Sequence, residues 1–148
     1  MILVRSGLCV GVVIWAAATA IFVPLGKFVF GPDNHVPVVL SAGLLVLATF
    51  FGIYWLAVRI LRREAAPSLE RGALFGVFAC LPGLILDAGL YAFNGGRYPG
   101  LDGGASGAMT CALLLAYAAA LLGTLGAART LGAARTLPNG PDAGARRT

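Results

Sequence analysis

Four predominantly apolar stretches constrain the fold of this chain more than any other feature. They run near residues 6–25, 36–58, 73–93 and 105–128. A bilayer core about 30 Å thick requires about 20 apolar residues in a helix, and in lipid the backbone polar groups of such a segment must bond within it. The sequence therefore predicts an all-α, polytopic membrane protein, with a bundle of four transmembrane helices in one domain, residues 1–128.

The composition excludes a water-soluble domain. Hydrophobic residues make up 59% of the chain and charged residues only 11%, so the bilayer is the expected partner of most of its surface. The net charge is +5, but the basic residues flank the apolar stretches and form no basic and aromatic platform for nucleic acid. We therefore expect lipid, and no nucleic acid, as a partner.

The basic residues indicate the orientation. Only two basic residues, Lys27 and Arg97, lie in the first and third breaks between the apolar stretches, on one side of the membrane. Nine arginines gather on the other side: Arg5, Arg59, Arg62, Arg63, Arg71, Arg129, Arg135, Arg146 and Arg147. Under the positive-inside rule this predicts cytoplasmic N- and C-termini. The expected location is a bacterial plasma (inner) membrane. Residues 129–148, which are polar and rich in Gly, Pro and Arg, are predicted to form a basic, disordered cytoplasmic tail.

The first apolar stretch also imitates a signal peptide. Arg5 precedes a short apolar run that ends in the small residues Ala18, Thr19 and Ala20, as at a cleavage site. Apolar character nevertheless continues through Val23 with no polar start to a mature chain. The prediction is a retained first span.

Asp87 is the only acidic residue inside the four predicted spans. A central aspartate costs about 2.5–3.5 kcal/mol to insert, so it needs a partner, a proton or water. We predict a polar site of residues at comparable depth or on the same helix face: Asp87, Tyr91, Asn94, Thr19, Ser41 and Thr110. Two interpretations stay open, a hydrogen-bonding clamp between helices and a proton or cation site that faces an outward cavity. Pro82 likewise allows a hinge or the ordinary tolerance of proline in membrane helices.

Small residues at helical spacing mark the predicted helix-packing faces. Such residues let helix backbones approach closely in lipid, and the set comprises Gly7, Gly11, Gly72, Gly76, Gly83, Ala116 and Gly123. One such face packing inside the bundle and another against a second copy would give a homodimer. Another membrane protein is the alternative partner.

Several short motifs resemble a family of small four-helix bacterial membrane proteins known only as a domain of unknown function. They are Trp15–Ala20 leading to Phe30 and Pro32–Asn34, and then Leu81–Leu84 with Asp87 in the third stretch. The resemblance covers about residues 1–128. It implies the four-helix architecture and brings no activity, cofactor or site.

No residue pattern predicts an enzyme, a metal site or a cofactor. Cys9, Cys80 and Cys111 lie singly in apolar segments, and the lone His35 lacks companions for a metal site. Nucleophile, metalloprotease and phosphate-binding motifs are not present in the sequence. We expect a non-enzymatic accessory or scaffold protein that acts by helix packing; the alternative is a small proton-coupled transporter that uses Asp87.

Overall fold

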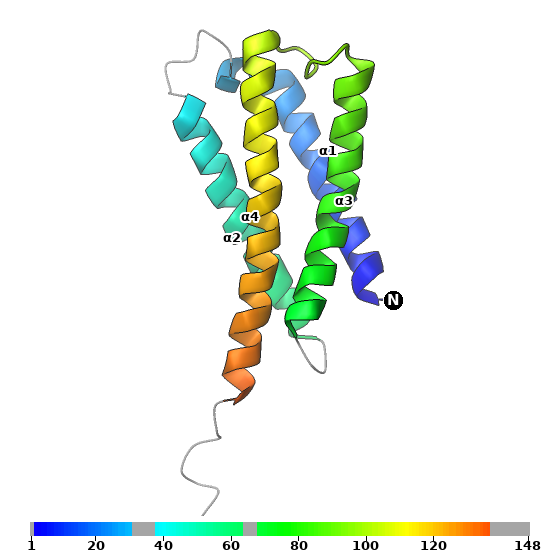
Figure 1. The fold of residues 1–148 in the computed structure, drawn as a ribbon, viewed down its shortest axis with the longest axis vertical. Helices are drawn as coiled ribbons and strands as arrows, with labels where there is room; N and C mark the ends of the chain where they lie inside the picture. Colours follow the sequence, from blue (N-terminus) through cyan, green and yellow to red (C-terminus); the bar gives the residue numbers. More distant parts are fainter. Residues whose placement is uncertain (1, 31–37, 64–67, 137–148) are drawn as a thin grey trace, which may run out of the picture.

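In its described residues, the computed structural model has four long helices. They alternate in direction between the two ends of a bundle (Figure 1). The structure describes residues 2–30, 38–63 and 68–136. Helix α1 covers Ile2–Phe30, α2 covers Val38–Leu61, α3 covers Leu69–Phe93 and α4 covers Gly103–Thr136. All four are long and apolar enough to cross a membrane. The predicted all-α fold with four candidate spans is confirmed for the described residues, and its orientation stays a prediction.

Two helices run beyond their predicted spans. Helix α1 continues through Pro24 to Phe30, because a long apolar helix can tolerate the loss of the single backbone hydrogen bond that a proline removes. Helix α4 continues past Ala128 to Thr136. Residues 129–136 therefore differ from the predicted disordered tail, since their alanines, arginines and leucine are good helix formers. Residues 137–148 lie outside the described part of the chain.

The helices pack as two closely fitted pairs. Helix α1 runs along α3, α2 runs along α4, and the pairs meet mainly where α3 contacts α4. Glycines permit these approaches: a Cβ at Gly11 would overlap the carbonyl oxygen of Ala79, and one at Gly123 would lie 2.9 Å from the carbonyl oxygen of Phe50. Helices α1 and α2 contact each other little, so this side of the bundle is the least closed.

The predicted helix-packing residues lie at contacts within the chain. Gly7 and Gly11 face α3, and Gly123 faces α2. Gly72, Gly76 and Gly83 all face α4. Ala116 is buried. These small-residue faces are occupied inside the bundle, and the homodimer stays a prediction.

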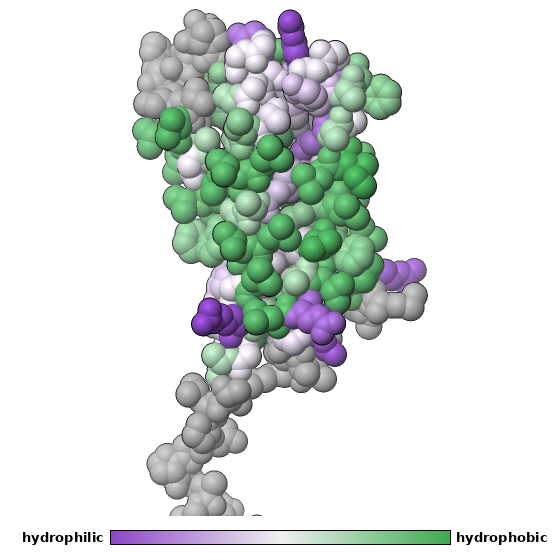
Figure 2. All heavy atoms as spheres, in the orientation of Figure 1, coloured by the Kyte–Doolittle hydropathy of each residue, from purple (hydrophilic) through white to green (hydrophobic). Residues whose placement is uncertain are grey.

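The outer surface carries large apolar side chains, whereas a water-soluble protein buries most of them. On the face drawn in Figure 2, a broad hydrophobic band covers the middle of the bundle, and hydrophilic residues lie near its two ends. Large apolar side chains point outward, for example Val13 at 67% exposed, Ile85 at 62% and Leu122 at 61%. Most buried residues are alanines and glycines. Small residues inside and large apolar ones outside are typical of helices packed in lipid.

The turn between α3 and α4 is built by capping residues and glycines. Helix α3 ends at the cap Asn94, whose backbone N–H donates to Leu90. Gly95, Gly96 and Gly100 follow with φ of 66°, 76° and 77°, a region that other residues enter at a cost. The Asp102 carboxylate accepts a hydrogen bond from the backbone N–H of Ala105 over 2.8 Å and so caps α4. Tyr98 lies in this turn and is buried.

Candidate functional site

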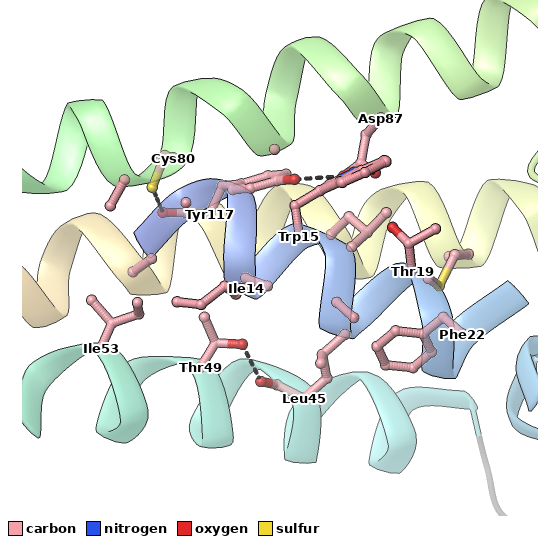
Figure 3. A pocket seen from close by; sticks show the side chains of 18 of the residues that line it. Ile14, Trp15, Thr19, Phe22, Leu45, Thr49, Ile53, Cys80, Asp87 and Tyr117 are labelled. Carbon is pink, nitrogen blue, oxygen red and sulfur yellow. Dashed lines mark hydrogen bonds between the residues drawn. The ribbon is translucent and has the colours of Figure 1, made fainter. Parts of the chain in front are cut away.

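The carboxylate of Asp87 is the centre of a hydrogen-bonded group that joins three helices, and Figure 3 shows it beside Trp15 and Tyr117. Trp15 Nε1 on α1 donates to Oδ1 over 2.8 Å, and the Tyr98 hydroxyl donates to the same oxygen over 2.7 Å. The Tyr117 hydroxyl on α4 donates to Oδ2 over 2.5 Å. We call these four residues the Asp87 cluster. The three donors are neutral, so the carboxylate gains hydrogen bonds from them but no compensating charge.

The free energy contributed by the three hydrogen bonds is comparable to the cost of placing an aspartate in an apolar span. Hydrogen bonds between membrane helices contribute on average about 0.6 kcal/mol and at most about 1.7 kcal/mol. Three of them therefore contribute about 2–5 kcal/mol, against an insertion cost of about 2.5–3.5 kcal/mol for a central aspartate. The cluster offsets the cost of Asp87 with little excess. Removing one of the three hydrogen bonds should therefore leave part of this cost without compensation.

Gly83 makes the space that Tyr117 needs to reach Asp87. A Cβ at Gly83 would lie 2.5 Å from the Tyr117 hydroxyl oxygen and 2.9 Å from its Cε1. Gly83 is one helical turn before Asp87 on α3, so the phenol crosses the glycine and meets the carboxylate beyond it. The Cys80 thiol also donates to the Tyr117 backbone carbonyl over 3.8 Å. Asp87 and Cys80 thus link the α1/α3 pair to the α2/α4 pair.

Tyr98 is fixed by its backbone as well as by its hydroxyl. It is 4% exposed, and its backbone N–H donates to Ser106 Oγ over 2.6 Å. Burial raises the pKa of the Tyr98 phenol, and its hydrogen bond to Asp87 raises that pKa further. The phenol therefore stays a hydrogen-bond donor across the physiological pH range.

A central cavity lies between the two helix pairs, with Asp87 in its wall (Figure 3). The centres of water-sized molecules could occupy about 90 Å³ of it, and all of its empty space out to and including its open side is about 690 Å³. All four helices line it, and its walls are mainly apolar. The polar groups that line it are the Asp87 cluster, Thr19, Thr49 and Cys80. The Thr49 hydroxyl donates to its own helix at Leu45, which leaves the Asp87 cluster as the main polar feature of the cavity.

A second cavity lies between α3 and α4, on the other side of the same cluster. The centres of water-sized molecules could occupy about 230 Å³ of it, and all of its empty space out to and including its open side is about 580 Å³. Among its lining residues are Leu84, Tyr91, Thr110 and Leu114. Asp87, Tyr98 and Tyr117 line both cavities. These three side chains and their hydrogen bonds therefore form part of the wall that divides the two spaces.

The structure divides the predicted polar site into separate places. Thr19 and Asp87 line the central cavity, whereas Tyr91 and Thr110 join Asp87 at the second cavity. Asn94 caps α3 and its side chain donates to the carbonyl of Arg97. Ser41 is half-buried on α2 and lines neither cavity. None of the other five predicted residues forms a hydrogen bond to Asp87 among the described residues.

The predicted set does not contain the three donors to Asp87. Trp15 carried a signal, because a tryptophan well inside an apolar span needs an acceptor for its indole N–H. Tyr117 was noticeable as the tyrosine of the fourth span, but its depth relative to Asp87 depends on how α3 and α4 are offset. Tyr98 follows Asp87 by eleven positions and reaches it only because the turn folds back, which no residue spacing indicates.

Within residues 2–30, 38–63 and 68–136, no three His, Cys, Asp or Glu side chains lie together as metal ligands. Asp33 and His35 lie outside these residues. No protein-family model matches the chain, and no curated protein and no solved structure is significantly similar to it.

Proposed function

We propose that this chain is a small proton-coupled transporter of the bacterial inner membrane, with both termini in the cytoplasm and Asp87 as the coupling carboxylate. The observation that carries the proposal is the position of Asp87. Its side chain lies in the wall of a cavity inside the bundle and at the contact between the two helix pairs. Ionisable residues at such positions are typical of proton and substrate pathways.

Protonation of Asp87 would change the contact between the helix pairs directly. An ionised carboxylate accepts all three hydrogen bonds of the cluster. A protonated carboxyl has one oxygen that carries a proton and donates, so it accepts less well from Tyr98 or Tyr117. Since the Tyr117 bond joins α3 to α4, gain or loss of a proton biases how firmly the two pairs are held together.

The pairwise packing supplies elements that can move against each other. Close backbone contacts stabilise α1 on α3 and α2 on α4, whereas α1 and α2 contact each other little. Two rigid halves around a central site are what rocking-type alternating access requires. The wall of Asp87, Tyr98 and Tyr117 between the two cavities would rearrange in such a motion.

The second candidate is the accessory or scaffold protein, in which Asp87 acts only as a clamp. Its supporting observation is that three protein donors satisfy the carboxylate. We favour transport because a clamp alone needs no cavity beside it, and because the small-residue faces that would recruit a partner are occupied within the chain.

The two candidates differ in proton movement. The purified chain is reconstituted into liposomes that enclose a pH-sensitive dye, and gradients of three aromatic probes are imposed: the cation ethidium, the anion 8-anilinonaphthalene-1-sulfonate and the neutral N-phenyl-1-naphthylamine. If the chain is a proton-coupled transporter, the gradient of at least one probe drives protons across the liposome membrane, and Asp87→Asn abolishes this proton movement. The matched control is Asp102→Asn, which removes an exposed acid but keeps a good helix cap.

Protein-dependent proton movement with one probe, lost in Asp87→Asn and kept in Asp102→Asn, supports transport. Proton movement with none of the three probes refutes it and leaves the clamp. Circular dichroism of each variant establishes that it is folded. If Asp87→Asn does not fold, Tyr117→Phe replaces it, because this change keeps the carboxylate but removes its link to α4.

A further inference from the structure

We propose that the central cavity binds a lipophilic cation with aromatic or other apolar substituents, and that Asp87 is its counter-charge. This inference rests on the proposed transport function and names the substrate class of the same site. The structure combines three features that select this class: a negative group without a basic partner in the cluster, aromatic faces around it, and apolar walls.

The carboxylate keeps capacity for a ligand after its three hydrogen bonds. An ionised carboxylate has about four lone-pair positions, and Trp15, Tyr98 and Tyr117 use three of them. Its neutral donors leave its charge in place. In an apolar wall this charge attracts a cation and repels an anion much more strongly than it would in water.

Aromatic side chains surround the carboxylate. Phe22 and the three donors Trp15, Tyr98 and Tyr117 line the central cavity together with Asp87. The faces of aromatic rings attract cations, most strongly where water is excluded and for cations that shed water easily. A cation that carries apolar groups therefore gains contacts from the carboxylate and from the rings at once.

The remaining walls accept apolar substituents. Ile14, Ile53, Met109 and Leu113 line the cavity from α1, α2 and α4. The cavity lies beside the least closed side of the bundle, where α1 and α2 contact each other little. A lipophilic ligand that partitions into the bilayer can therefore approach without leaving the hydrocarbon.

A cation and a proton compete for the same carboxylate, which is the basis of coupling. The titratable groups around Asp87 are the phenols of Tyr98 and Tyr117, which donate to it, and the phenol of Tyr91, which lines the second cavity with it. The Cys80 thiol lines the central cavity. No lysine or arginine lines the cavity among the described side chains. Acidification therefore weakens cation binding through Asp87 itself, and by linkage a bound cation weakens proton binding equally.

Trp15 provides a direct binding assay. The chain has two tryptophans, and Trp55 lies on α2 with the Arg59 guanidinium 3.9 Å from its ring centroid, outside the cavity lining. A Trp55→Phe background leaves Trp15 as the only tryptophan reporter. The full chain in nanodiscs is titrated with tetraphenylphosphonium and, separately, with tetraphenylborate, which has the same shape and the opposite charge.

We expect saturable quenching of Trp15 by tetraphenylphosphonium and none by tetraphenylborate. Asp87→Asn weakens the cation's affinity about tenfold or more, while Asp102→Asn leaves it unchanged. In the parent chain the cation's affinity also falls as the pH is lowered, a readout that needs no mutant. Equal binding of both ions, or cation binding that neither Asp87→Asn nor acid weakens, overturns the inference.

Failure of this inference is distinguishable from failure of the proposed function. Proton movement driven by the anionic or the neutral probe but not by ethidium, with no binding of tetraphenylphosphonium, leaves a transporter with another substrate class. Asp87-dependent binding of tetraphenylphosphonium without proton movement for any probe leaves a cation-binding site in a protein that does not transport.

Discussion

Replacing Tyr117 with phenylalanine tests whether Asp87 holds the two helix pairs together. The change removes one hydroxyl group and keeps the ring that packs against Gly83. The hydroxyl is the only hydrogen-bond donor to Oδ2 among the described residues, and the bond joins α3 to α4 over 2.5 Å. The lost stability should therefore report the link between the pairs rather than a change in packing.

The expected loss follows from the kind of bond. A hydrogen bond to a charged group contributes about 1.5–3 kcal/mol in soluble proteins, whereas bonds between membrane helices average about 0.6 kcal/mol and reach about 1.7 kcal/mol. The Tyr117 bond is short, and its acceptor is an acid, which places it in the upper part of the membrane range. We expect Tyr117→Phe to lower the free energy of unfolding by about 1–2 kcal/mol, or about 5–30-fold in the unfolding equilibrium.

Tyr91→Phe is the matched control. Tyr91 lies on α3 one turn beyond Asp87, is 40% exposed and makes no hydrogen bond to Asp87. Removing the Tyr91 hydroxyl group should change the free energy of unfolding by no more than about 0.5 kcal/mol. Both variants are unfolded from the same mixed micelles with sodium dodecyl sulfate and followed by circular dichroism. If the Tyr117 variant is as stable as the Tyr91 variant, the link between the pairs does not depend on this bond.

Three further predictions concern packing, titration and orientation. Gly11→Ala should destabilise the fold by up to about 2 kcal/mol, since overpacking against the backbone of α3 costs about 1–3 kcal/mol and the gain in helix propensity returns about 1 kcal/mol. Gly52→Ala meets open space and should not destabilise the fold. Equal stability of the two variants would refute the close approach of α1 to α3 at Gly11. Burial and the Asp87 hydrogen bond raise the pKa of Tyr98. The stability that rests on its protonated phenol is therefore fully present below about pH 10 and is lost as the pH rises through the raised pKa. An absorbance step at 295 nm near pH 10 that disappears in Tyr98→Phe would contradict this prediction. In a cysteine-free chain, an impermeant maleimide added to intact cells should label Gly103→Cys and not Ala134→Cys, and the opposite result would reverse the predicted orientation.

Local composition determined the architecture before any tertiary contact was known. Each apolar stretch is long enough to cross hydrocarbon, and a backbone in hydrocarbon has to bond to itself, so four helices follow from length and hydropathy alone. The helix ends were less predictable. Pro24 does not end α1, and α4 continues to Thr136. Helix propensity and contacts with neighbouring helices extend these helices into residues whose hydropathy does not predict a span.

Asp87 could be singled out from the sequence, because an acid in hydrocarbon is costly wherever it lies. Its partners could not. Trp15, Tyr98 and Tyr117 belong to α1, a turn and α4, and their meeting at one carboxylate depends on how the helices are paired and offset along their axes. Helical periodicity shows which face a residue occupies but not which residue of another helix it meets.

The central cavity likewise exists only in the tertiary structure. It results from the close packing of α1 on α3 and of α2 on α4 with little contact between α1 and α2, an arrangement set by where glycines let two backbones approach. Sequence alone thus determined that an acid lies within one of four long apolar helices. The packing decided that it is accommodated by three neutral donors, in the wall between two cavities, because hydrogen bonds form only between groups that the fold brings within about 3 Å of each other.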